Sequence, residues 1–310
     1  MTDCQESVGV TRKPRRRWRQ ISLRTLLLLV TLLGVGLGWF VNRGERQRRA
    51  VAALEKIGAR IRYEAPGSPP ARDSFDYSRW LPRDYFDNVY AVDLAWNTGV
   101  DADMEHLGAL TGLVELDLAA THATDAGLSH IRGLTRLKRL NLAGTKITDL
   151  GLANIEGLTR LEWLDLSVTR TTDAGLVHLK ELTAIRLLNL NQTKVKGAGL
   201  VHLQGMKCLA GLWLDGAPIT DAGVAQVEGL KGLRFLDLRH TRVTDAGLAH
   251  IKGLPQLLGL HLEGTRVTDA GLPQLKGITT LEGVKLHKTG VTAAGAAKLK
   301  IVMPQCMIER

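Results

Sequence analysis

Residues 241–254, TRVTDAGLAHIKGL, occur again in closely similar form at residues 265–278, TRVTDAGLPQLKGI, and at residues 145–158, TKITDLGLANIEGL. Aligning these segments gives a period of 24 residues, and nine repeats begin without insertions at Val89, Leu113, Leu137, Leu161, Ile185, Leu209, Leu233, Leu257 and Leu281. A fixed period of this length is typical of proteins in which each unit packs only against its neighbours. The sequence therefore predicts a solenoid over residues 89–302, with one capping strand in residues 303–310.

Each repeat follows the pattern LxxLxLxxTx[IV]TDxGLxxLxxLxx. The opening LxxLxL predicts a short strand with alternate residues buried, and the leucines of DxGLxxLxxL suit one side of a helix. Asp149, or Thr148 before it, is placed to cap the start of that helix. The column Thr121, Thr145, Thr169, Thr193, Thr241, Thr265 and Thr289 is placed to hydrogen-bond the turn after the strand. Because helices are wider than strands, we expect an α/β array that bends with its strands concave.

The repeat resembles the leucine-rich repeat, and the resemblance covers residues 89–302. It implies a right-handed βα horseshoe with parallel strands on the concave face and helices on the convex face. The ITDxGL phrase is similar to the cysteine-containing subclass, although Thr stands here where that subclass has Cys or Asn. Residues 50–64, AVAALEKIGARIRYE, and 80–94, WLPRDYFDNVYAVDL, resemble bacterial membrane-anchored leucine-rich-repeat proteins. That family implies a topology but no defined ligand.

An uncharged apolar segment, residues 25–41, precedes the repeats. Its 17 residues would span about 26 Å as a helix, near the lower limit for crossing a bilayer. Seven positive charges lie in the preceding flank, whereas four positive charges and Glu45 follow the segment. The positive-inside rule therefore predicts a single-pass signal-anchor in the inner cell membrane, with residues 1–24 cytoplasmic and the repeats extracytoplasmic. A signal peptide cleaved near Gly36-Leu37-Gly38 and a buried helix of a soluble domain are the alternatives.

The net charge of +10 is concentrated at the N-terminus, where eleven Lys or Arg and three acids in residues 1–50 supply +8. The remaining 260 residues carry only +2, so the sequence does not predict nucleic-acid binding. Residues 42–88 are expected to form a juxtamembrane helix over 46–60, a strand over 59–63 and a cap. Seven of the fourteen aromatic residues lie between Tyr63 and Tyr90, and a cap core is favoured there over a ligand pocket.

Positions that build every coil cannot encode one partner, so specificity is expected in the third, fifth and seventh residues of each repeat. Large apolar residues on an exposed strand face are unusual and indicate a contact patch. The predicted ligand-binding residues on the concave face are Trp163, Leu187, Trp213, Phe235, Asp165, Asp237, Arg239 and His261. The alternative is that these side chains pack only against one another.

Catalytic and metal chemistry find little support in the sequence. His106, His130, His178, His202 and His250 recur at one helix position, which is interpreted as solvent-facing because neighbouring helices lie too far apart to share an ion. Cys4, Cys208 and Cys306 form no CxxC pair, and Cys306 is expected to be a packing residue. No nucleophile, base and orienting group occur together. We therefore expect neither an enzyme, nor a metal site, nor a cofactor.

The leading hypothesis is a membrane-anchored scaffold that binds a protein or peptide outside the cytoplasm. A second hypothesis is an intracellular substrate adaptor, because ITDxGL is similar to the repeats of ubiquitin-ligase adaptors. No recruiting domain precedes the repeats here, whereas an apolar segment does. A third hypothesis is a passive structural protein of the bacterial envelope, for which substitutions on the concave face would change only stability.

Overall fold

The computed structural model describes residues 22–63, 88–97 and 100–310. The chain forms two units, residues 1–42 and 43–310. In the first unit the described part belongs to helix α1 (Leu23–Lys56), which is one unbroken helix of 34 residues. The sequence predicts two helical segments here, 25–41 and 46–60, but no residue between them breaks the helix. Of the aromatic residues expected in the cap, those from Phe75 to Phe86 lie outside the described residues.

The last turns of α1 belong to the second unit and bury one side of the helix. Gly44, Gln47, Ala50, Val51 and Leu54 are its buried residues, at the spacing of a single helix face. The helix ends earlier than residue 60 because Gly58 adopts the left-handed conformation, with φ of 85°. Its N–H donates to the Glu55 carbonyl, and the Ala59 N–H donates to the Leu54 carbonyl. These two bonds form a Schellman motif that turns the chain into the first strand.

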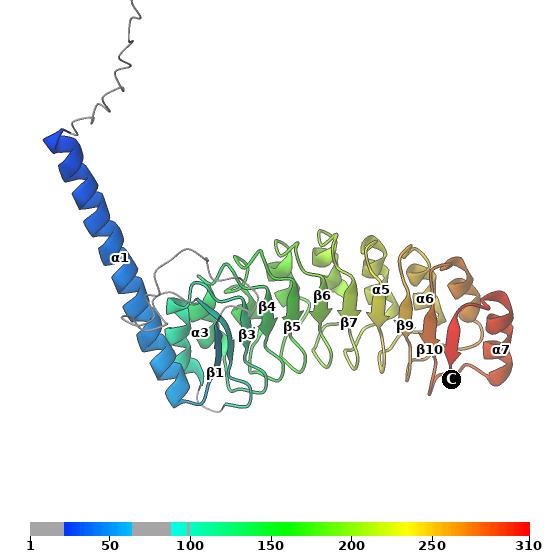
Figure 1. Ribbon diagram of the computed structural model, residues 1–310. Helices are drawn as coiled ribbons and strands as arrows, with labels where there is room; N and C mark the ends of the chain where they lie inside the picture. Colours follow the sequence, from blue (N-terminus) through cyan, green and yellow to red (C-terminus); the bar gives the residue numbers. More distant parts are fainter. Residues whose placement is uncertain (1–21, 64–87, 98–99) are drawn as a thin grey trace, which may run out of the picture. The chain divides into compact units, whose positions relative to one another are not determined.

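The described residues of the second unit contain one sheet of eleven strands, ordered as in the sequence (Figure 1). The strands are β1 (Arg60–Tyr63), β2 (Val89–Asp93), β3 (Glu115–Asp117), β4 (Arg139–Asn141), β5 (Trp163–Asp165), β6 (Leu187–Asn189), β7 (Gly211–Trp213), β8 (Phe235–Asp237), β9 (Gly259–His261), β10 (Gly283–Lys285) and β11 (Met307–Glu309). β1 pairs antiparallel with β2, and every later pair is parallel. The parallel sheet expected from the repeat is therefore confirmed.

The second half of each repeat is only partly α-helical. The α-helices are α2 (Val100–Asp103), α3 (Asp125–Leu128), α4 (Asp149–Leu152), α5 (Asp221–Ala225), α6 (Asp245–Ile251) and α7 (Ala293–Val302). The 3₁₀ helices are η3 (Met104–Ala109), η4 (Ser129–Ile131), η5 (Gly175–Leu179), η6 (Ala198–Leu203), η7 (Gln226–Gly229) and η8 (Leu272–Gly277). Leucines at a spacing of three lie directly above one another when the helix has three residues per turn, whereas in an α-helix they drift around the axis. The spacing therefore favours 3₁₀ turns over the continuous helix expected from the sequence.

Leucines of adjacent coils stack to form the core. The fourth residues of the repeats are buried and lie in register on neighbouring strands, as for Leu188, Leu212 and Leu236. The column threonines are buried as well, except Thr289, which is half-buried, and each hydroxyl donates to the carbonyl three residues earlier, as Thr145 does to Leu142 at 2.6 Å. Each coil thus closes its own turn, and this fixes which strand residues point away from the core.

A ladder of hydrogen bonds joins the starts of successive helical segments. Thr148 caps its own helix by accepting from the Leu150 N–H, whereas the Asp149 carboxylate reaches the next coil. It accepts from the Thr172 N–H at 2.7 Å and from the Thr172 hydroxyl at 2.6 Å. In five other pairs of coils the Thr N–H and hydroxyl donate in the same way to the Asp carboxylate of the preceding coil: Thr124 to Asp101, Thr148 to Asp125, Thr244 to Asp221, Thr268 to Asp245 and Thr292 to Asp269. Of the two residues that the sequence offers as caps, the Thr is therefore the cap and the Asp is a link between coils.

The ladder is interrupted between the coils of β6 and β7. Lys196 and Gly197 stand there where other repeats have Thr and Asp, so Thr220 receives no carboxylate from the preceding coil. Gly197 has φ of 112°, and a Cβ on it would overlap the Cα of Gly223. Close contact between two glycine backbones therefore replaces the Asp–Thr link at this joint.

The last coil is followed by β11, which pairs with β10. Cys306, just before β11, is buried in the core, and Ile308 packs partly against it. Burial raises the pKa of the Cys306 thiol. The structure thus places Cys306 as a packing residue with an unreactive thiol.

Candidate ligand-binding face

The third, fifth and seventh residues of the repeats point away from the leucine core, and we call this surface the strand face. On β7 the alternation is direct: Leu212 is completely buried, whereas Gly211 and Trp213 lie on the other side. All eight residues that the sequence selects as ligand-binding belong to the strand face. The bend of the array stays a prediction.

Four large side chains form an apolar row on the strand face: Trp163 on β5, Leu187 on β6, Trp213 on β7 and Phe235 on β8. Trp163, Leu187, Gly211, Phe235 and Gly259 occupy matching register positions on five successive strands. Gly211 would interrupt the row, but the ring of Trp213 lies over it. A Cβ on Gly211 would stand 2.5 Å from Trp213 Cη2 and 2.9 Å from Leu187 Cδ2. The four side chains therefore cover the third-position column continuously.

Phe235 extends the row beyond its own strand. A Cβ on Gly259 would stand 2.9 Å from Phe235 Cδ1, so the phenyl ring leans over the glycine of β9. The Phe235 side chain remains 49% exposed. Gly211 and Gly259 thus allow the rings of Trp213 and Phe235 to lie along the sheet, which widens the apolar surface while the strands stay paired.

Arg139 and Glu115 mark the β3–β4 end of the row. The guanidinium carbon of Arg139 lies 4.8 Å from the ring centroid of Trp163, a cation–π contact. Glu115 accepts from Arg62 at 2.7 Å and lies 3.9 Å from Arg139 Nε. A hollow of about 210 Å³ is lined by these groups together with Asp93 and Asp117. Arg60 approaches Asp93 at 3.9 Å, so the basic residues of β1 partly neutralise this end.

Asp117 and Asp165 keep their negative charge without a basic partner among the described residues. Asp165 accepts from the N–H and hydroxyl of Ser167 and from the amide of Asn189, at 2.6–2.8 Å. Asp117 accepts in the same way from Ala119 N–H and from Asn141. Neutral donors therefore hold these carboxylates in place beside the apolar row, and neither carboxylate is tied into an ion pair with a described residue.

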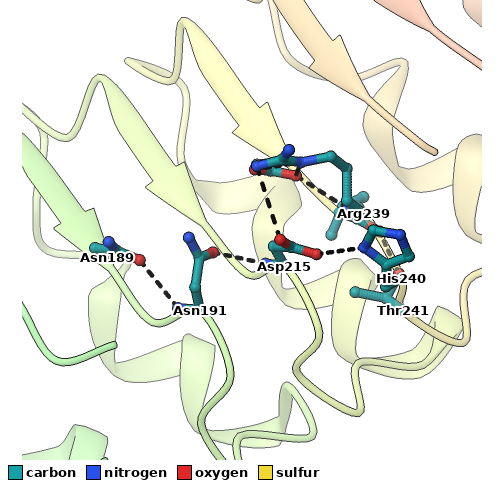
Figure 2. A network of polar contacts seen from close by, with 8 residues as sticks. Asn189, Asn191, Asp215, Arg239, His240 and Thr241 are labelled. Carbon is teal, nitrogen blue, oxygen red and sulfur yellow. Dashed lines mark hydrogen bonds and ion pairs between the residues drawn. The ribbon is translucent and has the colours of Figure 1, made fainter. Parts of the chain in front are cut away.

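A polar network links the segments that follow strands β6, β7 and β8, and Figure 2 shows it from close by. The Asn191 side chain accepts from the Asp215 N–H at 2.7 Å, and His240 Nδ1 lies 2.7 Å from Asp215 Oδ1. Arg239 lies 3.8 Å from the same carboxylate. These bonds connect three consecutive coils on the side of the strand face where the strands end.

Asp237 differs from the expectation that its carboxylate is offered to a ligand. Asp237 is only 3% exposed, and Arg239 donates to both of its carboxylate oxygens at 2.7–3.0 Å. Asp237, followed by Asp215, holds the pKa of Arg239 above its ordinary value. The two charges lie two residues apart on the same chain segment, where a long guanidinium can fold back onto the carboxylate. The pair therefore does not present a free acid.

His261 lies on β9 in register with Asp237. Glu263, two residues later, has one carboxylate oxygen that is buried and without a hydrogen-bond partner among the described residues.

The structure brings Trp163, Leu187, Trp213, Phe235 and Asp165 together as one surface, with Arg239 and His261 at its β8–β9 side. The sequence-based selection missed Arg139, Gly211 and Gly259; small residues in a column of large ones are the signal that would have indicated them.

Other candidate features of the described chain do not form a comparable surface. Within the described residues, no three His, Cys, Asp or Glu side chains lie close enough to hold a metal ion. In the histidine column, His178 and His250 pair with Glu156 and Glu228 of the preceding coil, at 2.5 and 2.7 Å. A second hollow, of about 430 Å³, lies between η8 and α7 and is lined by apolar groups and by lysines.

Comparison with known proteins agrees with the geometry of the coils. Residues 111–170 match the model of the family described as Leucine rich repeat. A comparison with curated protein sequences gives no match. Leucine-rich-repeat proteins are typically interaction scaffolds and are generally not enzymes.

Several solved bacterial proteins have a similar structure. An internalin of Listeria monocytogenes (inlF) is 21% identical over 71% of this chain and 60% of its own, with a TM-score of 0.61. A second Listeria monocytogenes internalin (inlC2) is 22% identical over 66% of this chain and 80% of its own, with a TM-score of 0.53. A leucine-rich-repeat protein of Leptospira interrogans is 22% identical over 70% and 59%, with a TM-score of 0.55. The chain spans about three fifths of the first and third proteins. At these identities the likeness shows the fold, a leucine-rich-repeat solenoid.

Proposed function

We propose that this protein is a membrane-anchored scaffold that binds a protein ligand outside the cytoplasm through its strand face. The apolar row carries the proposal. Solvent-facing strand residues of a soluble array are ordinarily polar, whereas here four large apolar side chains lie side by side on β5 to β8. An apolar centre with polar residues around it is the arrangement of a protein-binding hot spot.

The anchor is supported by the first part of α1. It is the one helix among the described residues that is long and apolar enough to cross a membrane, with a mean hydropathy of 1.9 over its most apolar window. Residues 23–39 are exposed in the described structure. A signal sequence can have the same length and composition, but here the apolar run continues through Trp39 and Phe40 past the small residues Gly36 and Gly38, which favours a retained anchor. The charge asymmetry around residues 25–41 favours the orientation with the solenoid outside the cytoplasm.

Binding is tested with two matched leucine variants of the full-length protein. Leu187→Ala removes part of the apolar row, whereas Leu150→Ala removes a leucine that is 78% exposed at the start of α4. The full chain and both variants are used to capture partners from the membranes of cells that express it, with quantitative mass spectrometry. We expect one set of partners to be lost with Leu187→Ala and kept with Leu150→Ala. A partner set unaffected by Leu187→Ala would favour a passive envelope protein.

Topology is tested with a reporter fused after Arg310 that is active only outside the cytoplasm. We expect activity together with a membrane-bound, full-length chain. A cleaved N-terminus would indicate a signal peptide instead of an anchor. A cytosolic, soluble full-length chain would favour the intracellular adaptor.

A further inference from the structure

We infer that the ligand segment bound by the strand face is a cationic, amphipathic α-helix that lies across strands β5 to β8 with its apolar side on the row. This inference rests on the proposed binding function and names the chemistry of the partner. Three properties of the strand face carry it: its charge, the spacing of the row, and the absence of free backbone groups along it.

The strand face is acidic in a basic protein. Its outward positions hold seven acids, Asp93, Glu115, Asp117, Asp165, Asp215, Asp237 and Glu263, and three bases, Arg139, Arg239 and Lys285. Internal pairing satisfies Glu115, Asp237 and, through Arg60, part of the charge of Asp93. Asp117 and Asp165 form no ion pair among the described residues and are held by neutral donors, and Asp215 and Asp237 share one arginine. A partner with Lys or Arg flanking its apolar side chains complements this pattern.

The spacing of the row matches a helix better than an extended chain. Neighbouring strands lie about 4.8 Å apart, so Trp163 to Phe235 spans three strand steps, about 14 Å. Helix residues at i, i+4, i+7 and i+11 advance about 16 Å along one side, close to one anchor per strand. Alternate side chains of an extended peptide are about 6.8 Å apart, so four of them would span about 20 Å and fall out of step with the strands.

The hydrogen-bonding groups of the ligand backbone also favour a helix over an extended peptide. The strands of the row are paired on both sides, β6 with β5 and β7, and β7 with β6 and β8. The row therefore offers side chains but no strand edge to which a peptide could add. An extended peptide pressed onto Leu187 and Trp213 would bury N–H and C=O groups without partners, which is costly. A helix satisfies those groups internally.

The experiment uses the full-length protein in phosphatidylcholine nanodiscs and three immobilised synthetic peptides of about 14 residues. The first has leucines on one helix face and lysines beside them. The second replaces every lysine by glutamate, and the third keeps the lysine composition but contains prolines that prevent a helix. Binding is measured by interferometry, with empty nanodiscs as the blank for peptide binding to lipid.

We expect the lysine helix to bind at least tenfold more tightly than either other peptide at low salt, with the preference over the glutamate helix shrinking as salt is added. Trp213→Ala should weaken the lysine helix at least tenfold. The double variant Asp117→Asn and Asp165→Asn should weaken it about fivefold and leave the glutamate helix unchanged or slightly improved. Leu150→Ala should change nothing.

Each contrary result has a separate meaning. Equal or tighter binding of the glutamate helix would overturn the cationic partner, and equal binding of the proline peptide would overturn the helix. Failure of all three peptides to bind would overturn the inference, while the membrane capture with Leu187→Ala would still decide the scaffold function. If peptide binding were insensitive to Trp213→Ala, the binding role of the row would fail as well.

Discussion

The indole ring of Trp213 lies over Gly211, two residues earlier on the same strand, and a Cβ at Gly211 would stand 2.5 Å from its Cη2. A tryptophan on the outward side of a strand is thereby partly buried without entering the leucine core. The indole ring fills the space that a side chain at Gly211 would occupy, and Leu187 of the neighbouring strand β6 borders the same space. The apolar row is thus built by a pair of residues on one strand as much as by the alignment of strands.

Leu212→Ala and Trp213→Ala should separate core from surface. Leu212 is fully buried, so its truncation leaves a cavity and should lower the free energy of unfolding by about 2–5 kcal/mol. Trp213 loses contacts only with Gly211, Leu187 and nearby strand-face groups, so Trp213→Ala should cost about 1 kcal/mol. Urea denaturation of both variants checks this. Equal destabilisation would contradict the placement of Trp213 on the strand face.

Gly197→Ala should destabilise the joint at which the Asp–Thr ladder is interrupted. The residue has φ of 112°, and a Cβ would overlap the backbone of Gly223. Strain at the left-handed conformation and a shift of the neighbouring coil should together lower the free energy of unfolding by at least about 2 kcal/mol.

Gly133→Ala is the matched control, because a Cβ there meets nothing within 4 Å. We expect this control to change the unfolding midpoint little or to raise it slightly, since alanine restricts the unfolded chain. Hydrogen exchange should show faster opening on both sides of the joint in Gly197→Ala only. A Gly197→Ala protein as stable as the Gly133→Ala protein would contradict the close backbone contact.

Acid should weaken the last rung of the ladder. Hydrogen bonds from the Thr292 hydroxyl and N–H hold the pKa of Asp269 below its ordinary value of 3.8. Because the pKa is lower in the folded than in the unfolded protein, the stabilisation from this carboxylate is fully present above about pH 4 and is lost as the pH falls through the folded pKa. Wild type should therefore exceed Asp269→Asn in stability at pH 6, and the difference should shrink towards pH 2.

Urea midpoints of both proteins, measured from pH 6 to pH 2, check that dependence. Glu282→Gln serves as the control, because Glu282 is exposed and its side chain forms no hydrogen bond or ion pair within the described residues. A difference between wild type and Asp269→Asn that stays constant over this range would mean that the carboxylate is not the titrating group.

The two described cysteines should differ in reactivity. Cys208 is exposed, whereas Cys306 is buried and burial raises the pKa of its thiol. Because the thiolate is the reactive form, iodoacetamide should modify Cys208 in the native protein and Cys306 only after unfolding. Peptide mapping by mass spectrometry at pH 8 measures both. Rapid native modification of Cys306 would mean that the last coil opens readily.

Much of the fold can be predicted from the sequence because each 24-residue repeat has the same spacing of leucines. Leucines at the fourth and sixth positions must be buried, so the residues between them must face outward, and a strict period puts equivalent residues of every coil in register. The outward position of Trp163, Leu187, Trp213 and Phe235 could be predicted for this reason. So could the burial of Cys306, because Cys306 and Ile308 alternate as inward residues of the expected last strand.

Contacts between side chains of different coils needed the structure. The sequence shows a Thr-Asp pair but not that Asp149 serves the next coil, since a cap and an inter-coil link use the same two residues. Asp237 occupies an outward position yet is covered, because Arg239 folds back on it. In the sequence, Gly211 interrupts the large third-position residues, and only the structure shows that the ring of Trp213 lies over it. A periodic sequence specifies the direction of each side chain through backbone geometry, whereas rotamers and pairings depend on the space that neighbouring coils leave.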